Sequence, residues 1–407
     1  MSERVLVLGA GVYQVPLIKA AKQRGYETLV ASIPGAYPGF ELCDKAIYAD
    51  TRDEETLLKV ARNEQISAVV TACTDVSVPA LGRICDEMNL VGVSHSSAVL
   101  ASDKTAMKQA FAAHGVSTAP FRVLSIGASG QECEEAAEQI GYPAIFKAVD
   151  SSGSRGIVKV ESPIDIARAM SEVRSVTKAD CFLIEKFLVG TEFGMQGFVQ
   201  DGVAEITMLH GDYLFHGDAD VPMGHYVPYG SSKFAEAACE EATKAMRALG
   251  IVNGAANIDA ILCDNKIFII EIGARAGATC LPELVSLRYG INYYDLILSN
   301  ALGQHVDIPK ENNSCVAAMI LCPAKEGVVD SIERIPEIDD CVRFCSIDCR
   351  PGDAIHKFKV GPDRIGQIVC CAASLDEAEE KLFDAIDGVK IRLHDGSYMT
   401  WAEPDKN

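Results

Sequence analysis

The stretch Asn257-Ile-Asp-Ala-Ile-Leu-Cys-Asp-Asn-Lys-Ile-Phe-Ile-Ile-Glu-Ile-Gly-Ala-Arg275 decides the fold at the centre of this chain. Two apolar runs rich in β-branched residues flank the short polar break Asp264–Lys266. Such a pattern is typical of two antiparallel strands joined by a tight turn. The sequence therefore predicts a β-hairpin here, and its register decides where its acidic side chains point.

If Cys263 pairs with Ile267 across a three-residue loop, Asp259 lies opposite Glu271. Directly opposed residues share one face of a sheet, whereas a slip of one residue would send the two carboxylates to opposite faces. Two carboxylates on one apolar face repel each other unless a cation lies between them. Mg²⁺ is usually held by one or two carboxylates plus substrate phosphates. The hairpin thus predicts a magnesium site, followed by Arg275, a permanent cation suited to an oxyanion or a carboxylate.

A second motif lies upstream, where an apolar strand ends at Lys147 and runs into the Gly/Ser-rich loop Ser151–Gly156. Glycine lets backbone N–H groups approach phosphate oxygens closely, and Lys147 adds a point charge at the mouth of the loop. The loop is not a Walker A sequence, because no Gly-Lys-Ser/Thr follows it and no helix opens from it. Alone it is equally compatible with a plain hairpin turn, but together with the acidic hairpin it predicts nucleotide binding.

In this combination the chain resembles the ATP-grasp superfamily, particularly its carboxylate–amine ligases, which include amino-acid (dipeptide) ligases. Biotin-carboxylase-like purine enzymes are close relatives of these ligases. The resemblance covers residues 1–310 well and the remainder loosely. It implies an ATP-grasp fold of mixed α/β and α+β class, with ATP as a substrate and Mg²⁺, or Mn²⁺, as the metal.

The resemblance also implies roles for individual residues. Lys104 and Lys147 match the two ATP-binding lysines of the family. In the hinge, Glu185 and the backbone around it would meet adenine, while Glu192 would meet the ribose. Asp259 and Glu271 match the magnesium carboxylates, and Arg275 and Lys147 would act on the transferred phosphoryl group. The remaining ATP-binding positions implied by the match are Ser152, Gly153, Ser154 and Gly156 in the flap and Lys186, Phe187 and Leu188 in the hinge.

One position departs from the family pattern. The family often carries an asparagine two residues after the second acid, and this chain has Gly273 there. In the predicted register Asn257 lies opposite Gly273, so we expect its amide to take the third place at the metal.

The chain is long enough for several domains. Residues 1–101 alternate short apolar strands with amphipathic helices, which predicts a Rossmann-like domain with a parallel sheet. We expect the ATP-grasp domain over residues 102–309, with a lid subdomain over about 120–187, and a small α+β domain over 310–407. The predicted N-terminal strands are Arg4–Leu8, Glu27–Ser32, Lys45–Ala49 and Ala68–Thr71, and the predicted helices are Val15–Arg24, Glu54–Glu64, Gly130–Ile140, Glu161–Val173 and Leu375–Ile386.

Gly9-Ala-Gly11 after the first strand raises the alternative of an NAD-binding dehydrogenase. Gln14 stands where the dinucleotide fingerprint needs a third glycine, and no acid closes the second strand. A tight strand-to-helix turn is the favoured interpretation. Asp75 follows the fourth strand, where ligands of open α/β sheets gather, so it is a candidate substrate contact or a helix N-cap.

The segment between hinge and hairpin is rich in His, Tyr and Gly, and in the resembled ligases it meets the carboxylate substrate. His225 and His216 are candidates for substrate binding or proton transfer, or are ordinary hydrogen-bonding loop histidines. Pro282 and Glu283 open a further helix, whose free N–H groups are able to hold a carboxylate. Glu283 itself fits an ordinary first-turn acid.

The chain of 407 residues carries a formal net charge of −20, which argues against nucleic acid or an anionic membrane as a partner. We expect small-molecule partners and a cytoplasmic location; dimers are common in the resembled family, so a homodimer is one of the oligomeric states left open. The fifteen cysteines are mostly scattered in apolar segments and are expected to be free thiols. The spacing of Cys341, Cys345 and Cys349 fits neither a zinc knuckle nor a common iron–sulfur pattern.

The sequence therefore predicts an ATP-dependent ligase that activates a carboxylate as an acyl phosphate and joins it to an amine. An ATP-grasp carboxylase that uses bicarbonate shares the same ATP residues and is the first alternative. A binding protein without turnover is disfavoured because both acids and both lysines are present. The sequence leaves open which carboxylate and amine are joined, and the oligomeric state.

Overall fold

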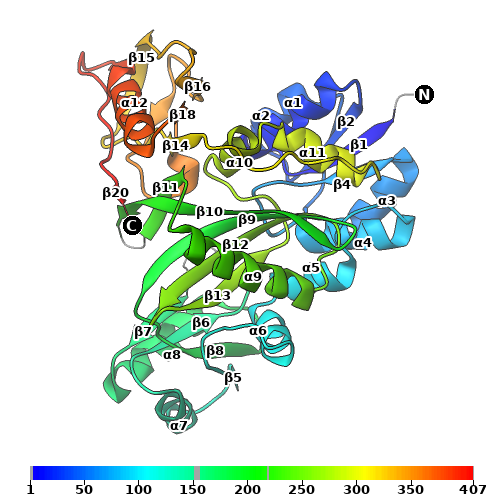
Figure 1. Cartoon of the computed structure of the whole chain (residues 1–407), viewed down its shortest axis with the longest axis vertical. Coiled ribbons are helices and arrows are strands. Elements are labelled where there is room, and N and C mark those ends of the chain that lie inside the picture. The colour runs from blue at the N-terminus through cyan, green and yellow to red at the C-terminus, as the bar shows by residue number, and fades with distance from the viewer. Residues whose placement is uncertain (1–2, 151–155, 218–219, 407) are drawn as a thin grey trace.

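The protein is described by a computed structural model over residues 3–150, 156–217 and 220–406. Figure 1 shows a large central sheet with the N-terminal domain and the C-terminal strands beside each other at one end and a small lid sheet at the other. Among the described residues, no helix has both the length and the apolar composition that crossing a bilayer would require.

The N-terminal domain is a parallel four-stranded sheet of order β3-β2-β1-β4, as the alternating pattern predicted. The predicted strands are confirmed to within one residue. The side chain of Gln14 lies over the glycine loop: its Oε1 accepts from Gly11 N (3.0 Å) and its Nε2 donates to Ala72 O (2.6 Å). The elements are β1 Arg4–Leu8, α1 Val15–Gln23, β2 Glu27–Ser32, α2 Pro38–Leu42, β3 Lys45–Tyr48, α3 Glu54–Glu64, β4 Ala68–Val70, α4 Val78–Met88 and α5 His95–Ser102.

The lid is an antiparallel four-stranded sheet of order β5-β8-β6-β7, reached through α6, Lys104–Ala113. Its buried residues form a hydrophobic cluster separate from the two clusters of the rest of the chain, so the lid packs as a unit of its own. The predicted helix Glu161–Val173 begins later, after a 3₁₀ turn at Pro163–Asp165. The elements are β5 Phe121–Ser125, α7 Gly130–Ile140, β6 Ala144–Ala148, β7 Ile157–Val160, α8 Ile166–Val176 and β8 Cys181–Lys186.

The central sheet has nine strands and runs in the order β13-β12-β9-β10-β11-β14-β18-β16, with β20 paired to β10. Its C-terminal strands therefore continue the same sheet through the pairing of β11 with β14. These strands are β9 Thr191–Gln200, β10 Val203–His216, β11 Asp220–Val227, β12 Gly254–Cys263, β13 Lys266–Gly273, β14 Cys315–Ile320, β16 Val342–Ile347, β18 Gly366–Ala372 and β20 Asp405–Lys406.

Helices and a small sheet cover this central sheet. Helices α10 and α11 pack near the N-terminal domain, where Arg24 donates to Asp295 O (3.0 Å) and Ser299 Oγ (2.8 Å) (Figure 1). The remaining elements are α9 Ser232–Ala248, α10 Leu281–Tyr289, α11 Tyr293–Ala301, α12 Leu375–Gly388 and the small sheet of β17 Ala354–Ile355, β15 Gly327–Arg334 and β19 Lys390–Leu393.

The β12–β13 hairpin confirms the predicted opposition of Asp259 and Glu271, but the predicted loop is wrong. Cys263 pairs with Lys266 instead of Ile267, so the turn has two residues. Asp264 and Asn265 both adopt positive φ angles (50° and 59°), as a tight hairpin turn requires. A β-bulge between Asp259 and the next residue absorbs the one-residue difference, so the acids still meet on one face.

The pairing of β11 with β14 depends on a glycine. A Cβ atom at Gly224 would lie 2.0 Å from Ala318 O. We expect Gly224→Ala to push these strands apart and to lower the free energy of unfolding by about 1–3 kcal/mol, as overpacking usually does. Urea denaturation followed by circular dichroism would measure this. Gly388→Ala is the control, because its added Cβ meets no atom within 4 Å; equal destabilisation by both substitutions would contradict the expectation.

Candidate active site

The pairings of the central sheet gather the predicted site residues on one face. Opposed residues share a face, so Glu271 on β13, Asp259 on β12, Gly194 on β9 and His210 on β10 form one row across four strands. We call this set of four residues the acid row.

The two acids of the row repel each other. Burial and the neighbouring Glu271 carboxylate raise the pKa of Asp259 to about 7. Lys104, at the start of α6, lies with its Nζ 2.9 Å from Glu271 Oε2. Burial would lower the pKa of Lys104, but the carboxylates around it raise the pKa above its usual value. The unrelieved repulsion and the oxygen donors fit a divalent cation such as Mg²⁺, with Asp259 and Glu271 as its ligands.

Asn257 lies opposite Gly273, as predicted, but its amide is oriented away from the predicted role. Gly277 N donates to Gln196 Oε1 (2.9 Å), and Gln196 Nε2 then donates to Asn257 Oδ1 (2.6 Å). This chain of bonds turns the amide nitrogen of Asn257 toward Asp259 Oδ1 (3.3 Å). The geometry favours Asn257 as a residue that orients the Asp259 carboxylate over the predicted role of metal ligand.

Gly273 is explained by an ion pair that reaches the site from the N-terminal domain. Arg275 donates from Nε to Asp75 Oδ1 (2.8 Å) and from Nη2 to Asp75 Oδ2 (2.9 Å). A Cβ atom at Gly273 would lie 2.6 Å from Asp75 Oδ1, so the Asp75 carboxylate occupies the space of a side chain there. Asp75 is not the N-cap of α4, which is Ser77. Burial opposes ionisation of Asp75, but Arg275 holds its pKa below the usual value.

Lys147 lies in a second buried cluster with a lysine that sequence reasoning missed. Lys147 Nζ donates to Glu185 Oε2 (3.0 Å), and Lys108 Nζ lies 3.3 Å from the same oxygen. Lys108 also donates to Thr118 Oγ1 (2.5 Å). Burial and the nearby Lys147 lower the pKa of Lys108 to about 8, against the attraction of Glu185. The signal was available, because Lys108 stands one helical turn after Lys104 and so lies on the same face of α6.

The hinge residues follow β8 at the junction of lid and central sheet. The Glu185 carboxylate contacts both Lys147 and Lys108. Lys186 Nζ donates to Gly141 O (3.1 Å) and Tyr142 O (2.9 Å), and Lys159 Nζ lies 4.3 Å from the centre of the Phe187 ring. Leu188 is half-buried and Glu192 is exposed. The predicted flap residues Ser152, Gly153 and Ser154 lie outside the described residues, and Gly156, just after them, has a φ of +68°.

The two histidines singled out lie in different surroundings: His225 is buried on β11, and His216 is exposed. His225 Nδ1 lies 2.6 Å from Asp212 Oδ1, and His210 Nδ1 lies 3.0 Å from the same atom. Burial lowers the pKa of His225, against the attraction of Asp212. His216 is exposed at the end of β10, 3.3 Å from Asp405. His210 and Asp212 were missed, although their spacing of two on a strand places both side chains on one face.

The remaining candidates have structural explanations. Glu283 is enclosed near the start of α10, where it accepts a hydrogen bond from Tyr294 Oη (3.0 Å), and burial raises its pKa. All fifteen cysteines are free thiols, as predicted. Within the described residues, Cys341, Cys345 and Cys349 form no group with metal-binding geometry.

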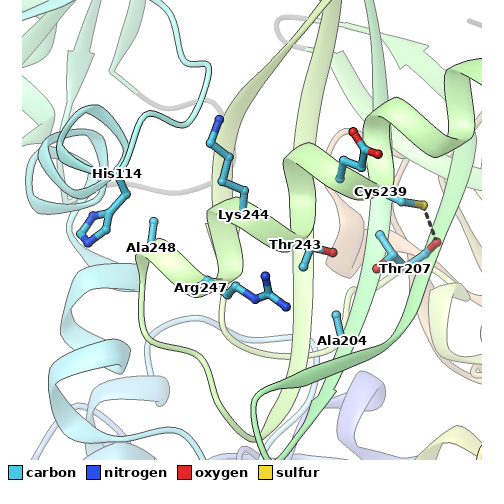
Figure 2. A pocket seen from close by; sticks show the side chains of 9 residues that line it. His114, Ala204, Thr207, Cys239, Thr243, Lys244, Arg247 and Ala248 are labelled. Carbon is cyan, nitrogen blue, oxygen red and sulfur yellow. Dashed lines mark hydrogen bonds between the residues drawn. The ribbon is translucent and has the colours of Figure 1, made fainter.

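A hollow of about 580 Å³ lies away from the acid row, beside α9 (Figure 2). In Figure 2 the side chains of Lys244 and Arg247 rise from α9, and Cys239 donates to Thr207 O (3.3 Å). No predicted site residue lines the hollow. Its lining is His114, Ala204, Thr207, Cys239, Glu240, Thr243, Lys244, Arg247 and Ala248.

The raised pKa of Asp259 predicts a specific pH dependence of stability. Without divalent cations the folded chain keeps this proton up to about pH 7, whereas the unfolded chain releases it near pH 3.8. Between these values the folded state binds more protons, so the free energy of unfolding falls as pH rises. Asp259→Asn removes this pH-dependent loss. Between pH 4 and pH 8, its free energy of unfolding is expected to rise by about 2–4 kcal/mol relative to that of the wild type.

Urea denaturation with a chelator at several pH values would measure this gain. The control is Asp264→Asn, which removes an exposed carboxylate from the turn of the same hairpin. Added Mg²⁺ should stabilise the wild type and the control but not Asp259→Asn. Parallel pH profiles for the wild type and Asp259→Asn would contradict the placement of the two acids.

Comparison with known proteins agrees with this geometry. The family described as the ATP-grasp domain matches residues 101–279, and the L-amino acid ligase C-terminal domain 2 matches residues 319–394. A phosphoribosylglycinamide synthetase from Anaerococcus prevotii is 34% identical, with 97% of this chain and 100% of that chain covered and a TM-score of 0.85.

Two further proteins are similar at lower identity. A D-alanine–D-alanine ligase from Geobacter sulfurreducens is 27% identical over 230 residues, which cover 53% of this chain and 71% of that protein. An L-amino acid ligase from Bacillus licheniformis is 18% identical, with 97% and 99% of the two chains covered and a TM-score of 0.78, and it shares the fold. With a mixed α/β fold, an N-terminal parallel sheet and a full-length relative above 30% identity, the chain belongs to the ATP-grasp ligase family.

Proposed function

We propose that this protein is an ATP-dependent carbon–nitrogen ligase that activates a carboxylate as an acyl phosphate and joins it to an amine. The observation that carries the proposal is the pair of acids Asp259 and Glu271, which share one sheet face, with Lys104 Nζ 2.9 Å from Glu271. ATP-grasp enzymes use ATP with Mg²⁺, and a bound Mg²⁺ would neutralise charge on the terminal phosphates. An amide product also agrees with the name of the Anaerococcus prevotii relative, a synthetase of phosphoribosylglycinamide.

The reaction has two steps. In the first, an oxygen of the substrate carboxylate attacks the γ-phosphorus of ATP, the bond to ADP breaks, and an acyl phosphate forms. In the second, the amine nitrogen attacks the acyl carbon, phosphate leaves, and the nitrogen loses a proton. No side-chain nucleophile is needed in either step, so the protein acts by position and charge.

We assign the roles in these steps to named cations. Lys147 has donor capacity left beyond its bond to Glu185, because an ammonium has three hydrogens. Its role is to hold the phosphates, together with Lys104 beside Glu271. Arg275 stabilises the charge that develops on the transferred phosphoryl or acyl oxygen. Asp75, held by Nε and Nη2 of that guanidinium, contributes the N-terminal domain's side of the substrate site.

The substrate class proposed is an amino acid or a similar small metabolite. The match of residues 319–394 to the L-amino acid ligase C-terminal domain favours it. The net charge of −20 does not oppose anionic substrates locally, because Lys104, Lys108, Lys147 and Arg275 all lie at the site. A bicarbonate-using carboxylase would use the same ATP residues and differs in the acceptor.

Acyl phosphate formation is the first test. With ATP and Mg²⁺, we expect ADP release that requires a carboxylate and rises when an amine is added. Hydroxylamine in place of the amine should trap the activated carboxylate as a hydroxamate. A screen of amino-acid pairs by phosphate release would identify the substrates. Bicarbonate-dependent ADP release without any organic carboxylate would instead establish the carboxylase, and ATP binding without turnover would refute both.

Arg275 is the second test. Removing one donor that stabilises a developing anion lowers kcat by a factor of about 100 to 1000. We therefore expect Arg275→Ala to reduce steady-state turnover by this factor while the folded fraction, followed by circular dichroism, stays high. Arg350→Ala removes a surface arginine whose side chain is 80% exposed and should leave turnover unchanged. An Arg275→Ala enzyme with full kcat would exclude the proposed role.

A further inference from the structure

A buried cluster of two histidines and one aspartate lies next to the acid row, and the ligation steps above do not use it. We infer that His210, Asp212 and His225 bind a transition-metal cation such as Zn²⁺, at a site separate from the one between Asp259 and Glu271. This inference does not depend on the proposed ligase reaction, because it concerns binding by residues that take no part in the phosphoryl chemistry.

Strand register brings the three side chains together. His210 and Asp212 alternate along β10 and so share a face, and His225 on β11 lies directly opposite Asp212. Both Nδ1 atoms face one carboxylate oxygen, at 3.0 Å from His210 and 2.6 Å from His225. The centroids of the two imidazole rings are 4.7 Å apart. One possible ligand atom from each of the three residues lies within 4.8 Å of the other two. Three protein ligands with an open fourth position are the arrangement of many zinc sites.

The cluster is enclosed, and one of its polar atoms lacks a partner. His210 and His225 are 3% and 4% exposed. Since Nδ1 of His210 faces Asp212, its Nε2 carries a bare lone pair, and that atom is buried without a hydrogen-bond partner. A buried polar atom left unsatisfied is unfavourable, and native proteins rarely keep one without a reason.

A cation inside the triangle changes this arrangement. The cation would bond to Nδ1 of both histidines and to Asp212 Oδ1. It would replace the hydrogens that the two Nδ1 atoms share with that carboxylate. Each neutral imidazole then carries its hydrogen on Nε2, so no net proton is released. The Nε2 edge of His210 lies over Gly194, where a Cβ atom would be only 2.3 Å from Nε2. The next residue of that row is Asp259.

The donor set selects the class of metal. Two imidazole nitrogens and one carboxylate suit Zn²⁺, Co²⁺, Ni²⁺ or Cu²⁺, whereas Mg²⁺ prefers oxygen ligands throughout. The same sheet face would thus carry an all-oxygen site on β12 and β13 and, beyond β9, a nitrogen-rich site on β10 and β11. A cation in the second site would also join β10 to β11, next to the point where His225 pairs with Ala318 of the C-terminal strand β14.

The experiment measures metal retention by the full chain. Protein stripped with a chelator is titrated with Co²⁺ and Zn²⁺, followed by ligand-field absorption, competition and elemental analysis. We expect one tightly held ion, and a loss of affinity of about tenfold or more in His210→Ala, Asp212→Asn and His225→Ala. His305→Ala is the matched control, because its Nδ1 lies 3.6 Å from the Asp201 carboxylate on the surface and should not affect the tight ion.

Two further measurements separate this site from other metal-binding groups. The double variant Asp259→Asn/Glu271→Gln should keep the tight Co²⁺, since it removes only the acid pair. Pulsed EPR of bound Cu²⁺ in the unaltered protein should show couplings from imidazole nitrogens. A thiolate charge-transfer band from the cysteines, loss of the ion in the acid-pair variant, or no retained ion at all would each overturn the inference.

Discussion

The repulsion between Asp259 and Glu271 is the constraint on which the rest of the site depends. The hairpin fixes both carboxylates on one face, and burial leaves Asp259 little water to screen it from the Glu271 charge, so Asp259 holds its proton to about pH 7. The neighbouring cations are arranged around this charge: Lys104 reaches Glu271 from α6, while Arg275 is held back by Asp75. The proposed ligand, a divalent ion with a triphosphate, would supply positive charge between the acids and phosphate oxygens for the lysines.

Two glycines give the face its shape. Gly194 and Gly273 both stand within the rows of the acidic hairpin, and each lacks a side chain where another element inserts one. The ring of His210 fills the space over Gly194, and the carboxylate of Asp75 fills the space over Gly273. Where the family often has an asparagine, this chain has Gly273. The carboxylate of Asp75, from the N-terminal domain, occupies the space that the asparagine side chain would take.

The sequence predicted what depends on local pattern and missed what depends on packing. Apolar alternation predicted the hairpin register and the N-terminal strands almost to the residue. The predicted turn was one residue too long. A β-bulge further along the strand compensates for the shorter turn, and a bulge does not show in the apolar alternation of the sequence. Lys108 and His210 were missed for a different reason. Helical and strand spacing show which face of its element Lys108 or His210 occupies. They do not show that Lys108 meets Glu185 or that the two histidines meet at Asp212.

Helix α6 connects these parts electrostatically. Met107 and Phe111 pack into the core that α6 shares with the central sheet, while the lid keeps a hydrophobic cluster of its own. Two lysines one turn apart then reach in different directions: Lys104 to Glu271 on the central sheet and Lys108 to Glu185 on the lid strand β8. The Lys108–Glu185 pair therefore joins α6 to the lid by an ion pair, while the hydrophobic clusters of the lid and the core stay separate. Under the proposed function, a phosphate that draws Lys147 away from Glu185 would leave Lys108 as the counterion of that carboxylate.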